Sequence, residues 1–123
     1  RLNSTWGGNL ADMVRFTLYL EIIENEGLVE KATESGAYLL KHLENLQNDY
    51  YPLVSNARGR GLFCAFDLPD GDVRDSVVNN IMDEGAVILG SGVKTIRFRP
   101  HLNISQNEID LGISMIKNSL DRC

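Results

Sequence analysis

The sequence contains little of what marks a secreted, membrane-embedded or nucleic-acid-binding protein. It has 2 cysteines in 123 residues, too few for the disulfide framework of a small secreted domain, so a reducing compartment is expected. Its apolar runs are far shorter than the roughly 20 residues that span a membrane. With 12 basic and 17 acidic residues, its formal net charge of −5 argues against a nucleic-acid partner. The remaining composition, 43% apolar and 24% charged, is typical of one globular domain.

An initiator methionine and a signal segment are also missing, because the sequence begins at Arg1 and enters a polar loop directly. A helix is predicted from Leu10 to Ile23, with Asn9 as its N-cap. Ten of its 14 positions are apolar or tyrosine, whereas a surface helix of a small domain needs only an apolar stripe. We therefore expect this chain to belong to something longer, in which a further domain or a partner subunit covers the helix.

The rest of the sequence predicts helices alternating with pairs of strands. Helical spacing of apolar residues and the breaks at Gly and Pro predict a helix over 28–48 and then a strand pair that ends in the buried run 62–68. A helix from about 73 to near 85 follows, and then strands at 86–89 and 95–99. The last helix begins with the capping box of Ser105 and Glu108. The glycines at 59 and 61 indicate a bulge or a close backbone approach. We expect a small sheet with helices packed against it.

The strand at residues 95–99 carries the first candidate site. Successive side chains of a strand point to opposite faces, so Arg97 and Arg99 share a face with Thr95, and Ile96 and Phe98 share the other. An arginine held on a rigid strand can bind a carboxylate through two parallel hydrogen bonds. The alternative is a solvated sheet face whose arginines pair with nearby acids, and the pattern alone leaves both interpretations open.

A second candidate lies at residues 3–5, where Asn3, Ser4 and Thr5 precede two glycines and a helix start. Hydroxyls and unpaired amides at such a place can bind a phosphate, although the same residues also suit a turn and a helix cap. No complete catalytic set is present: the two histidines do not suggest a metal site, and Cys64 lies in an apolar run typical of the core.

Three short sequence blocks, taken together and in their order along the chain, change the interpretation of both candidate sites. Residues 5–9 read TWGGN, residues 57–62 read ARGRGL, and residues 96–100 read IRFRP. Together they resemble the carboxy-terminal part of the class III pyridoxal-phosphate aminotransferases, and within that class the stretches 3–13 and 60–66 are most similar to the lysine 6-aminotransferase branch. The resemblance implies an α+β fold with a small, mostly antiparallel sheet and helices packed on one face. It also implies that residues 1–27 form a phosphate-contacting loop and an inter-domain helix, and residues 28–123 a small domain.

The resemblance also implies roles for single residues. Ser4 and Thr5 match positions that bind the phosphate of pyridoxal 5'-phosphate across a dimer interface, and Arg97 matches the arginine that pairs with the carboxylate of L-lysine or of 2-oxoglutarate. Asn3 is expected to line the same site, and Arg99 to support the strand. The Schiff-base lysine lies upstream, so this chain would hold no catalytic residue and would be inactive without the missing large domain.

We accordingly expect a cytoplasmic homodimer that transfers the ε-amino group of L-lysine to 2-oxoglutarate, with no metal, no nucleic acid and no membrane contact. Two alternatives stay open at this point. One is a sister ω-aminotransferase acting on ornithine or 4-aminobutyrate, and the other is a binding or dimerisation module without chemistry.

Overall fold

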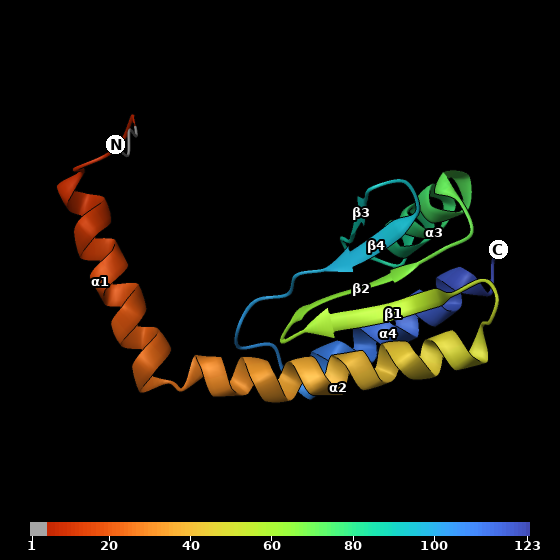
Figure 1. Cartoon of the computed structure of the whole chain (residues 1–123), viewed down its shortest axis with the longest axis horizontal. Helices are drawn as coiled ribbons and strands as arrows, with labels where there is room; N and C mark the ends of the chain where they lie inside the picture. Colours follow the sequence, from red (N-terminus) through yellow and green to blue (C-terminus); the bar gives the residue numbers. More distant parts are fainter. Residues whose placement is uncertain (1–4) are drawn as a thin grey trace.

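The computed structural model describes residues 5–123, which form four helices and a four-stranded sheet (Figure 1). In chain order the elements are α1 (Leu10–Asn25), α2 (Leu28–Asp49), β1 (Ser55–Arg60), β2 (Phe63–Asp67), α3 (Gly71–Asp83), β3 (Leu89–Ser91), β4 (Thr95–Phe98) and α4 (Gln106–Leu120). The predicted alternation of helices with strand pairs is confirmed. The chain segments 1–27 and 28–123 stay a predicted division.

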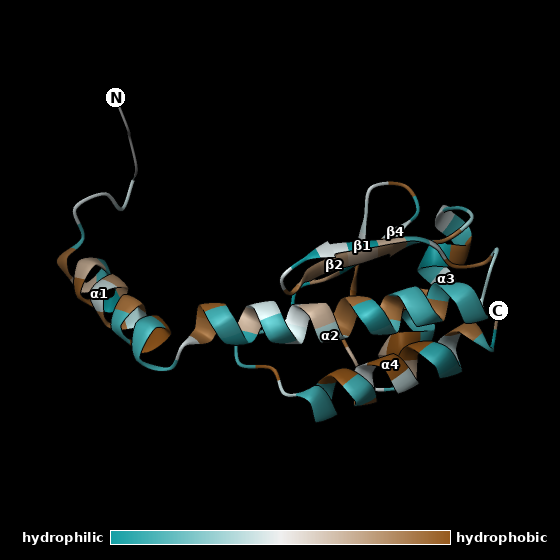
Figure 2. Ribbon diagram, turned by 60° about the horizontal axis from the view of Figure 1, so that its bottom comes forward, coloured by the Kyte–Doolittle hydropathy of each residue, from teal (hydrophilic) through white to brown (hydrophobic). Residues whose placement is uncertain are grey.

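The sheet has the strand order β1-β2-β4-β3, and every neighbouring pair is antiparallel. Helices α2 and α4 lie side by side against one face of it (Figure 2). Helix α3 contacts α4, β3 and β4 and contributes Val77 and Ile81 to the same core. No described helix covers the opposite face, so the expected α+β fold with helices on one face is confirmed.

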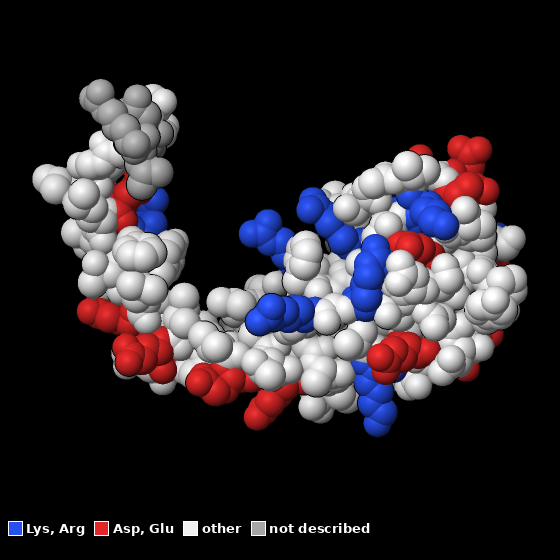
Figure 3. Space-filling view, viewed as in Figure 1, with Lys and Arg blue, Asp and Glu red and all other residues white. Residues whose placement is uncertain are grey.

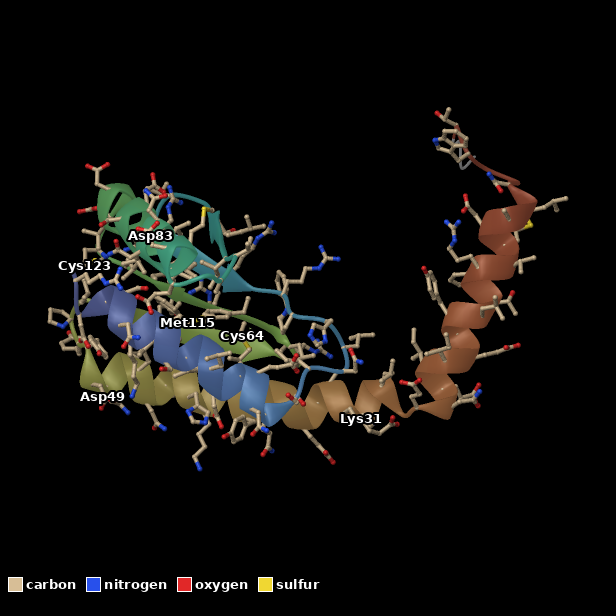
Figure 4. All side chains as sticks on the ribbon, turned by 180° about the vertical axis from the view of Figure 1, so that it is seen from behind. Lys31, Asp49, Cys64, Asp83, Met115 and Cys123 are labelled. Carbon is tan, nitrogen blue, oxygen red and sulfur yellow. The ribbon has the colours of Figure 1, made fainter. Side chains whose placement is uncertain are left out.

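The core lies between this face of the sheet and the three helices. Cys64 and Phe66 of β2 point into it together with Ile96 of β4, as strand alternation requires. Leucines of α2 and isoleucines of α4 close it from the other side at the expected helical spacing: Leu39, Leu43, Leu46, Ile109, Ile113 and Ile116. Figure 4 shows Cys64 on β2 and Cys123 at the end of the chain, and both are free thiols.

Helix α1 stands away from this core (Figure 1). Asn9 caps it, accepting a 3.2 Å hydrogen bond from the backbone N–H of Asp12, as predicted. Among the described elements it contacts α2 alone, and none of its residues is buried. The joint to α2 is Gly27, whose φ of 60° places it in the left-handed region that glycine tolerates.

The structure corrects one strand. The sequence predicts β3 over residues 86–89, whereas it runs from Leu89 to Ser91. Pairing decides its position, because Leu89 and Ser91 lie opposite Arg97 and Thr95 of β4 across the turn that joins the strands. Ala86 and Ile88, which made the segment look like a strand, pack against the core from an irregular segment.

The glycines before β2 mark a close approach, and the bulge of β1 lies a few residues before them. The backbone of Gly61 lies directly against Gly36 of α2, where a β-carbon on Gly36 would overlap it. A register shift between Ser55 and Arg58 bends β1 at Asn56, whose φ is 54°. The capping box at the start of α4 is also confirmed, since Ser105 and Glu108 exchange both of its hydrogen bonds.

Candidate functional site on the open face of the sheet

A row of four side-chain positions crosses the uncovered face of the sheet. Arg58 of β1 pairs with Ala65 of β2, Ala65 pairs with Arg97 of β4, and Arg97 pairs with Leu89 of β3. Because Cys64, Phe66 and Ile96 point into the core, the residues of this row point away from it. The sheet therefore holds two guanidinium groups in one row, separated by a small alanine.

Arg97 is half-buried and has apolar neighbours on both adjacent strands. Within residues 5–123, its guanidinium has no ion pair and no hydrogen-bonding partner. Side chains of Lys and Arg gather over the strands on this side, while acidic side chains follow the outer edge of α1 and α2 (Figure 3). A planar guanidinium in such surroundings presents parallel N–H donors that match a carboxylate.

Arg99 lies just beyond the end of β4 and is exposed to solvent. Arg99 follows Arg97 by two residues, the spacing at which side chains of a strand share a face. It has no β3 residue beside it, because β3 pairs with β4 only from Thr95 to Arg97. Arg97 is thus held between two strands, and Arg99 is not. This difference distinguishes the two arginines, and the ligand-binding role that the resemblance implies for Arg97 stays a prediction.

Arg58, the other arginine of the row, donates a hydrogen bond to a buried acid, Asp67, which the sequence analysis did not identify as part of a site. Asp67 is 9% exposed and receives hydrogen bonds from Thr95 Oγ1 at 2.6 Å, from Asn56 Nδ2 at 2.8 Å and from Arg58 Nη1 at 3.0 Å. Burial alone would raise the pKa of Asp67, but these hydrogen bonds and the charge of Arg58 outweigh it, so the pKa lies below its usual value. Asp67 is therefore a carboxylate that joins three strands.

An apolar groove of about 360 Å³ adjoins the end of β4. Ile88, Phe98, Ile104 and Ile109 are among the apolar residues that line it, and Arg97 and Arg99 line it as well. The groove thus places apolar surface beside the guanidinium. Nothing in it resembles a catalytic group, because its one acidic residue, Glu108, accepts the capping hydrogen bonds of Ser105.

The second predicted site is described only in part. Asn3 and Ser4 lie outside the described residues. Thr5 is exposed in the turn that leads to the N-cap of α1, and Gly8 in that turn has a φ of 82°. The structure does not bring Thr5 and Arg97 together, because α1 carries the start of the chain away from the sheet (Figure 1).

Other kinds of site are absent from the described part of the chain. No group of three or more His, Cys, Asp or Glu residues is placed to hold a metal ion there. None of the helices is both long enough and apolar enough to cross a membrane. The Cys64 thiol is buried, which raises its pKa and keeps it protonated, so it is a core residue as predicted and not a nucleophile.

Three comparisons with known proteins all find aminotransferases. A profile of the family described as aminotransferase class III matches residues 1–120. The L-lysine-epsilon aminotransferase of Mycobacterium tuberculosis is 47% identical over 98% of this chain, and that of Streptomyces clavuligerus is 45% identical over 98%. The human mitochondrial 4-aminobutyrate aminotransferase is 34% identical over 98% of the chain. The chain spans 27% of the length of the mycobacterial relative.

Solved structures show the same likeness. The lysine aminotransferase from M. tuberculosis in its internal aldimine form superimposes with a TM-score of 0.93 at 45% identity, covering 98% of this chain and 28% of that one. An aminotransferase from Bacillus anthracis superimposes with a TM-score of 0.92 at 33% identity, covering 100% of this chain and 30% of that one.

Proposed function

The chain belongs to aminotransferase class III, and on that premise we propose that it is the carboxy-terminal part of an enzyme that moves the ε-amino group of L-lysine to 2-oxoglutarate. The observation that carries the proposal is Arg97, a half-buried guanidinium on a strand with no acid beside it. The lysine-specific relatives, at 45–47% identity, support the amino donor over the 4-aminobutyrate enzymes, at 33–34%.

Arg97 recognises the end of the substrate that does not react. Its guanidinium would bind the α-carboxylate of lysine through two parallel hydrogen bonds, which fixes that end at the sheet. The distal ammonium is then held at the far end of an extended side chain, so it and not the α-amine is presented for reaction. The carboxylate of 2-oxoglutarate would use the same guanidinium in the second half-reaction. Ala65 beside Arg97 leaves space for either ligand.

Class III aminotransferases depend on pyridoxal 5'-phosphate, which when bound supplies an electron sink for the carbon that loses its proton. The residues of this chain fit one part of that group. Thr5 exposes a hydroxyl in the turn before α1, and hydroxyls and backbone amides at a helix start suit a phosphate. We assign the phosphate to Ser4 and Thr5 in the site of a second subunit, with Asn3 beside them.

The rest of the enzyme must come from outside residues 1–123. We propose that the large domain upstream contributes the Schiff-base lysine, and that it and a second copy of the protein cover the apolar residues of α1. The separation of Thr5 from Arg97 supports a homodimer, because one chain then serves two active sites. Cytoplasmic localisation is part of the same proposal.

Replacing Arg97 in the full-length enzyme tests the proposal. Arg97→Ala should raise KM for lysine and for 2-oxoglutarate by about 10- to 100-fold, the loss expected for a charge-assisted pair of hydrogen bonds. Arg99→Ala, two residues further along the chain and just beyond the end of β4, is the matched control and should change either KM less than about threefold. An Arg97→Ala enzyme with unchanged kcat/KM for both substrates would show the assignment to be wrong.

A sister activity has one observation in its favour, the 34% identity to human 4-aminobutyrate aminotransferase over 98% of the chain. Ornithine and 4-aminobutyrate both carry a carboxylate that Arg97 can bind. A panel of the three amines with the full-length enzyme separates the candidates. Lysine should give the highest kcat/KM, and a higher value for either competitor would replace lysine as the proposed donor.

A further inference from the structure

The sheet has a charge opposite in sign to that of the whole chain. Asp67 is the one acid among the residues of the four strands. These strands and the residue directly after β4 contribute four arginines: Arg58, Arg60, Arg97 and Arg99. The chain has a formal net charge of −5, so its other acids lie outside the strands. The uncovered face of the sheet is therefore a basic surface on an acidic chain, where Lys and Arg side chains gather (Figure 3).

Arg60 and Arg99 contribute most directly to this surface charge. Both are exposed, and within residues 5–123 neither side chain forms an ion pair or a hydrogen bond. Arg58, by contrast, lies 3.0 Å from the carboxylate of Asp67, which balances its charge. Arg60 follows Arg58 by two residues on β1, so both side chains point to the uncovered face.

Arg60 and Arg99 lie toward the same end of the sheet. Arg60 pairs with Phe63, and Cys64, the next residue of β2, pairs with Phe98, the residue before Arg99. Only β2 separates β1 from β4, which places the backbones of these two strands about 10 Å apart. At a Debye length of about 10 Å or more, the fields of the two guanidinium groups overlap, and they act together on a charged molecule that approaches this end.

We propose that Arg60 and Arg99 are specificity-determining residues that attract 2-oxoglutarate to the open face of the sheet by their charge. The inference rests on the proposed function, in which 2-oxoglutarate accepts the amino group. This acceptor has two carboxylates and is a dianion at neutral pH, whereas the donor lysine carries a net positive charge. A basic surface raises the local concentration of an anion and lowers that of a cation, so the two arginines favour the acceptor.

This role requires charge and not a particular shape. An arginine that binds a carboxylate directly presents two parallel N–H donors, an arrangement that lysine does not reproduce. Attraction from a distance needs only the positive charge, and it weakens as salt shortens the Debye length from about 30 Å at 0.01 M to about 10 Å at 0.1 M. Replacement of Arg by Lys and the dependence on salt therefore separate attraction from direct binding and from a structural role.

The test measures kcat/KM of the full-length enzyme for 2-oxoglutarate and for lysine at ionic strengths of about 0.01 M and about 0.3 M. Arg60→Gln/Arg99→Gln should lower kcat/KM for 2-oxoglutarate by about four- to tenfold at the lower ionic strength and by less than about twofold at the higher one. Each single substitution should account for about two- to threefold at the lower ionic strength. The kcat/KM for lysine should stay constant or rise, because a cation is no longer repelled.

Two control variants accompany this measurement. Arg60→Lys/Arg99→Lys keeps both charges and should retain the wild-type kcat/KM for 2-oxoglutarate within about twofold. Lys41→Gln removes one positive charge on the side of α2 away from the sheet, because Lys41 lies between the buried Leu39 and Leu43, and it should leave kcat/KM unchanged.

Three results would overturn the inference. The first is a Gln double variant with the wild-type kcat/KM and salt dependence, and the second is an equal loss of kcat/KM for both substrates, which indicates a structural defect. The third is a loss in the Lys double variant as large as in the Gln double variant, which indicates direct binding. The single variants carry the same comparison if the Gln double variant does not fold.

Failure of the proposed function has a different signature. Arg97→Ala removes a direct contact, so it should lower kcat/KM for 2-oxoglutarate at both ionic strengths. If it does so while Arg60→Gln/Arg99→Gln has no effect, the role of Arg60 and Arg99 is wrong and that of Arg97 stands. If the wild-type enzyme does not accept 2-oxoglutarate at all, the proposed acceptor is wrong, and the inference falls with it.

Discussion

A single pair of glycines sets how closely the longest helix can approach the sheet. Gly36 is buried in α2, and Gly61 begins the turn between β1 and β2 with a φ of 54°. With no side chain on either residue, the helix backbone rests directly on the turn. This contact fixes the turn that joins β1 and β2, next to the last pair of these strands, Arg60 and Phe63.

Gly36→Ala should therefore be strongly destabilising. Its β-carbon would overlap the backbone of Gly61, which cannot move aside as a flexible side chain would, so we expect a loss of about 1–3 kcal/mol in the free energy of unfolding. Gly112→Ala in α4 is the matched control, because nothing lies within 4 Å of its added β-carbon. That variant should gain up to about 1 kcal/mol from helix propensity. Urea denaturation measures both, and equal effects of the two substitutions would contradict the prediction.

At the scale of elements, helix α1 differs from the others in how it is stabilised. Its large apolar side chains are exposed along its whole length, including Leu10, Val14, Phe16, Tyr19 and Leu20. An isolated helix of its 16 residues is marginal in water, because most helical stability in proteins comes from packing of an apolar face. We therefore propose that polypeptide outside this chain covers the helix, as the apolar content of residues 10–23 predicts.

Hydrogen exchange should show this dependence directly. In the chain of residues 1–123, backbone amides of α1 should exchange at least tenfold faster than those of α2 around Leu43, which is fully buried. In the full-length protein the difference should disappear, since the large domain and the second subunit would cover α1. Equal protection of α1 in both forms, measured by mass spectrometry, would mean that the helix needs no such cover.

The elements show what sequence patterns can and cannot predict. Helices α2 and α4 follow from apolar spacing and from caps, which are local signals. The position of β3 does not, because its register is set by β4 and not by its own residues. The Asp67 cluster was missed for the same reason: its residues, Asn56, Arg58, Asp67 and Thr95, come from three strands and meet only through strand pairing. Alternation within one strand is a local signal that places Arg97 and Arg99 on the same face, but only the resemblance to class III aminotransferases singled out Arg97, whose role stays a prediction.

At the scale of the whole molecule, we propose that this chain supplies a carboxylate-binding residue and that the amine that carries out the transfer comes from the large domain. The lysines Lys31, Lys41, Lys94 and Lys117 are spread over α2, the β3–β4 turn and α4 (Figure 4 labels Lys31). Lys117 pairs with Asp49 at 3.5 Å, and the other three are exposed. A lysine that forms a Schiff base is usually desolvated or placed beside another cation, and none of these has such a place.

The chain of residues 1–123 should accordingly show no transamination when supplied with pyridoxal 5'-phosphate, lysine and 2-oxoglutarate. Formation of glutamate over several hours, followed by chromatography, is the measurement, and the full-length enzyme at equal concentration is the positive control. Lys94→Ala serves as a second control, since any activity that this substitution removed would place the reacting amine on the β3–β4 turn. Turnover by the short chain above the rate without protein would refute the prediction.

Gly27 joins α1 to α2, so its backbone angles set where the beginning of the chain lies relative to the sheet. The 16 residues of α1 form a rigid arm about 24 Å long between that glycine and the turn that holds Thr5. A swing of only about 5° at the pivot displaces the tip by about 2 Å, which exceeds the tolerance of a hydrogen bond. If Thr5 binds the cofactor phosphate in the site of a second subunit, as proposed, small rotations at Gly27 would be amplified at that site.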